Sequence, residues 1–204
     1  MKVLIVSKTH MHHGQCCVGG LTFEGENIRL VMEDGHYPPE NTDLTPGLIY
    51  NIEFTAKQNT EPPHIEDVIV HSYKLSEALE EHMLDFVEEL DVPIWRGGPE
   101  ELFDGKLQWT DNGSGYINAE DIPEQSVGFW VPNLPLRKSI YYEKVRYRCN
   151  VDGTLYSLPY IGYDEPVDVI PAGTLIRVSL ARWWDTNETT ELRCSLQLSG
   201  WYDL

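Results

Sequence analysis

The sequence predicts an all-β protein made of two OB-like five-stranded small β-barrels in tandem, with one linking helix between them. Three observations predict this fold. Stretches of alternating apolar and polar residues fill both halves of the 204-residue chain, turn-forming sequences separate them, and a single helical pattern lies between the two sets. Hydrophobic residues make up 41% of the chain, which is enough for packed cores.

The first set of strands is expected at residues 2–9, 15–23, 26–32, 48–58 and 66–75. Period-two alternation is clear in the third stretch, where Ile28, Leu30 and Met32 share a face. Glu24 and Gly25 begin a tight turn between the second and third stretches. The segment 33–47 is rich in Pro, Asn and Asp, as a long surface connection is.

The linking helix is expected from residue 76 to about residue 90. Ser76 is a suitable N-cap, and Pro93 closes the segment. Apolar residues recur at i, i+4, i+7 and i+11 and form one stripe. These residues are Leu79, Met83, Phe86 and Leu90.

The second set of strands is expected at residues 127–131, 139–150, 154–161, 173–182 and 191–202, after a loop-like stretch at 105–124. The resulting domain boundaries are 1–75 for the first barrel, 76–104 for the helix and a following turn, and 105–204 for the second barrel. Five strands per barrel is the count of an OB-fold, in which a helix often plugs one end. One continuous mixed sandwich is the alternative.

The charge is unevenly distributed along the chain. The formal net charge is −18. Residues 1–136 hold 7 Lys and Arg against 24 Asp and Glu, a net of −17, whereas residues 137–204 hold 8 against 9, a net of −1. A surface that binds a polyanion is therefore expected in the C-terminal third.

Basic residues alternate along one expected strand of that third. Tyr142, Lys144, Arg146 and Arg148 occupy every second position, so they would share one face of a sheet. Such a face can follow the backbone of a single strand of nucleic acid while aromatic side chains stack on bases. The alternative is the ordinary solvent face of an antiparallel sheet.

Two later strands extend the same theme. Arg177 and Arg193 lie opposite the apolar residues of their strands, and pairing of the strands would bring all the basic side chains together. Trp183 and Trp184 are adjacent and must point to opposite faces. One of them is therefore expected in the core, and the other is available for stacking.

The cysteines and histidines suggest no strong site. The four cysteines include no CxxC pair, and free thiols fit a reducing compartment. His10, His12 and His13 stand near Cys16, but their spacing matches no known metal module, and a loop with incidental histidines is the simpler interpretation. We predict no metal, no cofactor and no catalytic residue.

Three stretches resemble the bacterial dual OB-containing domain family. They are SKT…CVGG…ENIRL between residues 7 and 30, PPHIEDVIV from residue 62, and IRVSLARWW…ELRCSLQLSGWY in the last strands. The resemblance covers nearly the whole chain. It implies two OB-like barrels and a nucleic-acid- or nucleotide-binding module of bacterial conflict and defence settings. It implies no catalytic residues.

We therefore predict a cytoplasmic, non-catalytic module that binds single-stranded nucleic acid through the second barrel and does not act at a membrane. The alternative is a protein-interaction or small-ligand-sensing module whose acidic first barrel docks a basic partner. An enzyme would require His64 with Glu66 or Asp67, or a metal at the His10 cluster. The residues predicted to bind nucleic acid are Tyr142, Lys144, Arg146, Arg148, Arg177, Arg193, Trp183 and Trp184.

Overall fold

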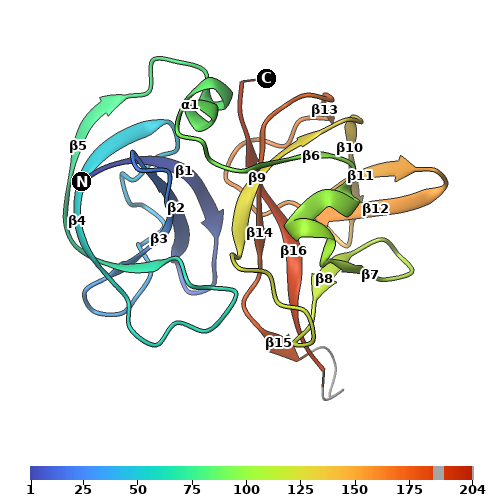
Figure 1. Ribbon diagram of the computed structural model, residues 1–204, viewed down its shortest axis with the longest axis horizontal. Helices are drawn as coiled ribbons and strands as arrows, with labels where there is room; N and C mark the ends of the chain where they lie inside the picture. The colour runs from blue at the N-terminus through green and yellow to red at the C-terminus, as the bar shows by residue number, and fades with distance from the viewer. Residues whose placement is uncertain (186–190, 204) are drawn as a thin grey trace. The chain divides into compact units, whose positions relative to one another are not determined.

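A computed structural model describes residues 1–185 and 191–203. The chain forms two compact units: unit 1 comprises Met1–Pro93 together with Asp203, and unit 2 comprises Ile94–Tyr202. Both units consist mainly of strands (Figure 1). The predicted all-β class with two OB-like barrels is confirmed.

Unit 1 is a closed barrel of five strands in the order β1-β2-β3-β5-β4 (Figure 1). Neighbouring strands are antiparallel except for β3 and β5, which run parallel. The barrel interior is filled by apolar side chains such as Leu4, Leu30 and Ile52, which are at most 1% exposed. The strands are β1 (Lys2–His10), β2 (Cys16–Thr22), β3 (Asn27–Met32), β4 (Leu48–Ala56) and β5 (Asp67–Ala78).

The helix of unit 1 is shorter than the sequence predicts. The expected helix began at Ser76, but β5 continues through this residue because Glu77 and Ala78 pair with Ile49 and Leu48 of β4. Helix α1 spans only Met83–Glu89. Its buried face contains Met83 and Phe86, as the apolar stripe predicts. Backbone pairing with β4 therefore overrides the helical propensity of residues 76–78.

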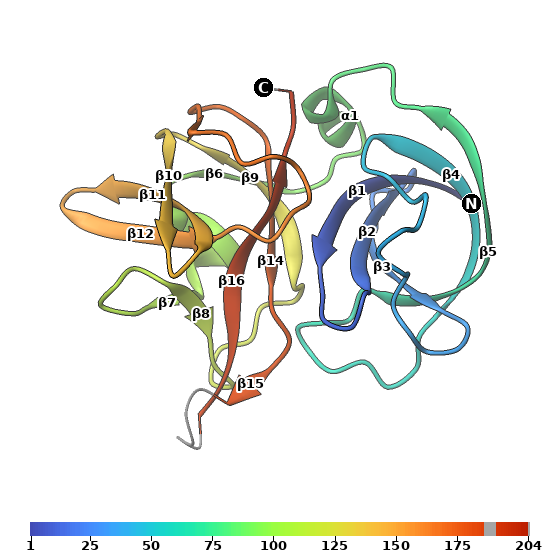
Figure 2. The same cartoon turned by 180° about the vertical axis from the view of Figure 1, so that it is seen from behind.

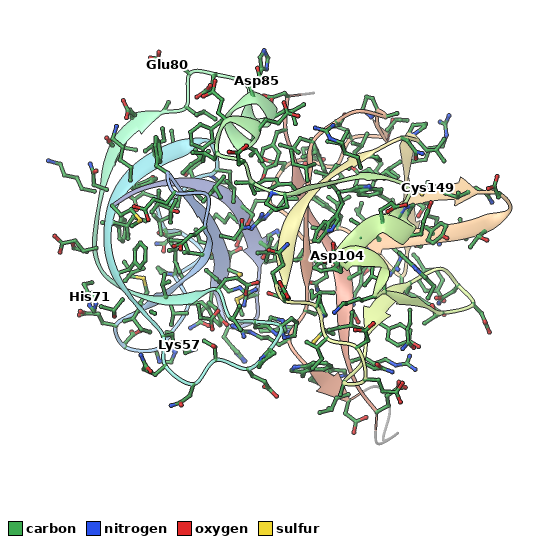
Figure 3. The ribbon with its side chains drawn as sticks, viewed as in Figure 1. Lys57, His71, Glu80, Asp85, Asp104 and Cys149 are labelled. Carbon is green, nitrogen blue, oxygen red and sulfur yellow. The ribbon has the colours of Figure 1, made fainter. Side chains whose placement is uncertain are left out.

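The PPHIEDV stretch supplies a buried ionic cluster where β5 begins beside β3. Arg29 Nη1 donates to Asp67 Oδ1 at 3.1 Å, and Arg29 Nη2 lies 3.8 Å from Glu66 Oε2. Lys57, labelled in Figure 3, donates to Asp67 Oδ2 at 3.2 Å. Charges are rarely buried unless they are paired, so this part of the motif has a structural role in the barrel.

Unit 2 begins with a strand, a short 3-10 helix and a small hairpin. These elements are β6 (Ile94–Gly97), η1 (Pro99–Gly105), β7 (Gln108–Trp109) and β8 (Gly115–Ile117). The remaining strands are β9 (Val127–Pro132), β10 (Leu136–Tyr141), β11 (Lys144–Val151), β12 (Thr154–Pro159), β13 (Val169–Ile170), β14 (Ile176–Leu180), β15 (Trp184–Asp185) and β16 (Leu192–Trp201).

The strand path of unit 2 repeats that of unit 1. Consecutive strands β9 and β10 together take the place of β1, because β10 pairs with β11 and β9 pairs with β14. Strand β11 pairs with β12, and β14 pairs with β16. A parallel bridge between Tyr160 and Leu198 joins the end of β12 to β16. This second barrel is more open than the first, and its strands fall into two sheets.

Two segments of unit 2 differ from the prediction. The expected strand 139–150 is broken into β10 and β11 by a two-residue turn at Tyr142 and Glu143, whose φ angles are 46° and 61°. The expected loop at 105–124 contains the β7–β8 hairpin, which packs beside β12 (Figure 2). The β10–β11 turn lacks the Asn-Gly or Asp-Gly pair that usually marks a hairpin. The β7–β8 hairpin has this signal at Asn112 and Gly113, but its strands are only two and three residues long and show no clear alternation.

The core of unit 2 lies on the inner side of both sheets. Its fully buried residues include Trp130, Tyr147 and Leu196. Of the helices formed by residues 1–185 and 191–203, none has both the length and the apolar character needed to cross a bilayer.

Candidate nucleic-acid interface

The outer face of β10 and β11 gathers four basic side chains. The register places Arg137 opposite Arg148, Ser139 opposite Arg146, and Tyr141 opposite Lys144, and directly opposite residues share a face. The alternate residues of β11 point into the core, as the buried Tyr147 and Cys149 do. We call the surface formed by Arg137, Lys144, Arg146 and Arg148 the basic face.

The positive charge of the basic face is not neutralised by nearby carboxylates. Within the described parts of the chain, none of its four side chains forms an ion pair. Other basic residues do pair with Asp or Glu: Lys2, Lys57, Lys106, Lys138 and Arg193. Four cations on one sheet face without an ion-pair partner among residues 1–185 and 191–203 are a local exception in a chain of net charge −18.

Arg146 is fixed in place by neutral partners. Its Nε donates to Ser157 Oγ at 2.7 Å, and its Nη2 donates to the Ser157 carbonyl at 2.8 Å and to Ser114 Oγ at 2.7 Å. Burial, followed by the neighbouring Arg148, lowers the pKa of Arg146. An arginine nevertheless stays protonated at neutral pH, so Arg146 contributes an oriented and uncompensated charge.

The β7–β8 hairpin extends this surface toward β16. Ser114, which directly precedes β8, accepts from Arg146, and Tyr116 is the middle residue of β8. Tyr116 pairs in register with Ser195 of β16, and the Arg193 guanidinium lies 3.9 Å from the centroid of the Tyr116 ring. The hairpin therefore connects the basic face with Arg193, although β11 does not pair with β16.

The two adjacent tryptophans separate as the alternation predicts. Trp183 is half-buried and packs against the core of unit 2. Trp184 is 71% exposed and lies directly opposite Arg193 in the pairing of β15 with β16. Trp184 is therefore the one available for stacking.

Tyr142 and Arg177 lie elsewhere than the sequence predicts. Tyr142 is in the β10–β11 turn rather than on the strand face, is 83% exposed, and has its ring 4.5 Å from that of Tyr141. Arg177 is only 1% exposed, and its guanidinium lies 4.5 Å from the Phe129 ring. A buried guanidinium is not presented to a ligand, so Arg177 is not part of the candidate interface.

Several residues of this surface were not among those predicted to bind. Alternation does not indicate Tyr141, because it does not predict the break between β10 and β11 that brings Tyr141 to the edge of the basic face. Ser114 and Tyr116 lie in the segment expected to be a loop, although the turn signal at residues 111–113 followed by Ser-Gly-Tyr-Ile could have indicated them. Ser157 has no sequence signal beyond its place in a strand.

The histidine and cysteine residues form no metal site in the part of the chain that the structure describes, where no cluster of three or more potential ligands occurs. His10 Nδ1 lies 3.6 Å from Glu40 Oε1. Cys16 is buried and donates to the carbonyl oxygens of Pro38 and Pro39 at 3.5 and 3.4 Å. All four cysteines are free thiols.

Unit 1 contains a shallow hollow of about 330 Å³ lined by polar side chains, among them Glu53, Ser72 and Lys74. Ser72 Oγ donates to Glu53 Oε2 at 3.0 Å. The hollow mixes both signs of charge and lacks a convergent set of like groups, so we do not treat it as a functional site.

Fold and surface together define a tandem OB-type protein with a basic, aromatic-edged sheet face on its second unit. The model of the dual OB-containing domain family matches residues 1–201, and the chain belongs to this family. No curated protein matches the chain.

Several solved structures align loosely with the chain. The Ifi202 HINa domain in complex with 20-base-pair double-stranded DNA is 10% identical, with 97% of this chain and 96% of that chain covered and a TM-score of 0.35. The p204 HINb domain is 12% identical, with 97% and 90% covered and a TM-score of 0.35. A murine DNA-binding protein bound to double-stranded DNA is 11% identical, with 97% and 91% covered and a TM-score of 0.31. TM-scores this low do not establish a shared fold or function with these proteins.

Proposed function

We propose that this protein binds single-stranded nucleic acid, without catalysis, through the outer face of unit 2. The observation that carries the proposal is the basic face, whose four cations lack ion-pair partners within the described residues. Phosphates on a flexible backbone are suited to such a stripe of oriented donors, and local charge governs that contact. Unit 1 is the acidic part of the chain, with 5 Lys and Arg against 17 Asp and Glu in residues 1–93.

The aromatic side chains beside the basic face favour a single strand over a duplex. Tyr141 and Tyr142 are 55% and 83% exposed at the β10–β11 turn, and Trp184 is 71% exposed on β15, opposite Arg193. In OB-folds the faces of the second and third strands and the loops between strands 1–2 and 4–5 bind oligonucleotides. In unit 2 these strands are β11 and β12, and the two loops contain Tyr142 and Trp184. We also propose the setting that the family resemblance implies, a cytoplasmic module of bacterial conflict and defence systems.

The test is fluorescence anisotropy with labelled single-stranded DNA and RNA oligomers and a duplex of the same sequence, at low and moderate salt. Lys144→Ala and Arg148→Ala should each weaken binding of the single strand. Each should also reduce the slope of log affinity against log salt concentration by about 0.7, because one phosphate contact is lost. The duplex should bind more weakly than either single strand.

Lys74→Ala is the matched control, because Lys74 is an exposed lysine of unit 1 and the substitution removes the same charge. It should leave affinity and salt slope unchanged. The proposal is wrong if no oligomer binds at low salt, or if Lys74→Ala weakens binding as much as Lys144→Ala does. If no oligomer binds at low salt, a basic protein that docks on the acidic unit 1 is the partner to test next.

A further inference from the structure

Arg193 is held on two sides by its neighbours in unit 2. Its Nε and Nη2 both donate to Glu191 Oε2, at 3.1 and 2.6 Å. The guanidinium also lies 3.9 Å from the centroid of the Tyr116 ring. Glu191 is itself anchored, because its Oε1 accepts from Asn118 Nδ2 at 3.2 Å. These contacts fix the position and plane of the guanidinium.

The arrangement leaves one end of the guanidinium available. An arginine has five N–H donors, and Glu191 takes the pair on the Nε side. Within residues 1–185 and 191–203 the structure records no acceptor for Nη1 or for the second Nη2 hydrogen, and the Arg193 side chain is 26% exposed. Hydrogen bonds from Arg193, and then from Asn118, lower the pKa of Glu191. The Glu191 carboxylate therefore stays ionised and keeps accepting the hydrogen bonds from Nε and Nη2 of Arg193.

An exposed aromatic residue lies directly across the strand pair from Arg193. Trp184 is directly opposite Arg193 in the β15–β16 pairing and is 71% exposed. Opposite residues of antiparallel strands have Cβ atoms about 5 Å apart on the same face. A base stacked on Trp184 would therefore lie within reach of the guanidinium.

We propose that Arg193 reads guanine, with Trp184 stacking the base, so that the interface has one guanine-selective position. Guanine presents two acceptors, O6 and N7, on its major-groove edge, and these match two parallel N–H donors of an arginine. On this same edge adenine presents one acceptor beside a donor, and cytosine and thymine offer no pair of acceptors. The inference rests on the proposed function, since it names the base that this interface prefers.

The test uses the full chain and short labelled oligothymidines that carry one central guanine, adenine or 7-deazaguanine. The guanine oligomer should bind at least about fivefold more tightly than the other two, the low end of what a bidentate arginine–guanine pair provides. Because 7-deazaguanine lacks only the N7 acceptor, its weaker binding to the unmodified protein tests the contact without any substitution. Competition by GMP and AMP shows whether free nucleotides are distinguished in the same way.

Two conservative variants separate base reading from charge. Arg193→Lys keeps the positive charge but loses the rigid fork of donors, so it should reduce the preference for guanine while the salt slope is retained. Arg148→Lys makes the same change on the basic face and should leave the preference intact. Trp184→Ala should weaken binding of the guanine and adenine oligomers by similar factors, because stacking does not depend on the base.

The outcomes distinguish the inference from the function on which it rests. Equal affinity for the three oligomers, with binding still sensitive to Lys144→Ala, overturns guanine selectivity and leaves the proposed function standing. No binding of any oligomer or nucleotide overturns both. Tighter binding of GMP than of AMP without binding of oligomers supports guanine recognition and identifies a free nucleotide as its source.

Discussion

At the scale of single residues, burial sets the chemical character of the thiols. Burial raises the pKa of Cys16 to about 11, and burial followed by the nearby Glu100 raises that of Cys149 to about 11. Cys149 is labelled on β11 in Figure 3. Thiolates, not thiols, react with electrophiles. Cys17 is only half-buried, so its thiol is more accessible than that of the buried Cys16.

We predict that iodoacetamide modifies Cys17 first in the folded protein near pH 8, and that Cys16 and Cys149 react only after unfolding. At pH 8 the Cys16 and Cys149 thiols are almost entirely protonated, because their pKa values are about 11. In the folded protein their reaction with iodoacetamide should therefore accelerate only as pH rises toward 11. Mass spectrometry of peptides from native and unfolded protein locates the modification. In Cys17→Ser the fast reaction should disappear, and rapid labelling of Cys16 in that variant would contradict the prediction.

At the scale of elements, the β7–β8 hairpin organises the proposed interface. Its turn is joined to β12 by the hydrogen bond from the Ser157 amide to the Gly113 carbonyl at 2.8 Å, and Ser114 then accepts from Arg146. Gly113 has φ +79°, and a Cβ at this position would overlap the Leu155 carbonyl oxygen. A glycine is therefore required here both by conformation and by the close approach of β12.

We predict that Gly113→Ala destabilises unit 2 by about 3 kcal/mol, combining left-handed strain with overpacking. Gly153→Ala is the control, because Gly153 has φ +89° but nothing within 4 Å of its Cβ position. Gly153→Ala should lower the free energy of unfolding only by the strain of the left-handed conformation, about 1 kcal/mol. Thermal unfolding measures the difference, at about 2–4 °C per kcal/mol for a chain of this size. Equal shifts would show that the hairpin is not pressed against β12.

The elements also show what the sequence can and cannot predict. Alternation located the strands of unit 1 well, since the turn residues and apolar positions are both local signals. It missed the break at Tyr142 and Glu143, because neither residue favours the left-handed conformation that both adopt. It likewise placed Arg177 on an open face, because alternation assigns a side chain to a face of a strand but does not show whether that face is covered. The helix was extended too far because the pairing of Glu77 and Ala78 with β4 is a long-range effect.

At the scale of the whole molecule, the protein carries a large excess of negative charge, −18 in total. Self-repulsion of this kind destabilises a compact state and is screened by salt. We predict that raising the salt concentration from low to physiological values increases the unfolding temperature of the free protein by a few degrees. The same increase in salt concentration should weaken binding to a nucleic acid. Binding releases counterions from the phosphates, and this release is less favourable when the surrounding solution already contains more salt.

Unfolding of the free protein, followed by differential scanning calorimetry over a salt series, checks the first part of this prediction. Anisotropy over the same series checks the second. A fall in unfolding temperature with added salt would mean that surface ion pairs, such as Lys2 with Glu77 and Lys138 with Asp168, outweigh the general repulsion. Sodium sulfate should not replace sodium chloride, because sulfate also strengthens apolar burial.

The order of strands in the two units has a consequence for synthesis of the chain. Unit 1 closes when β5 pairs with both β3 and β4, and β5 ends at Ala78, so nearly all of this barrel is available while later residues are still being translated. Unit 2 cannot complete its path until β16 has been made, because β16 pairs with β14 and bridges to the end of β12. We therefore expect the acidic barrel to fold first on the ribosome, whereas the second barrel, whose β10 and β11 carry the basic face, is completed only when β16 has been made.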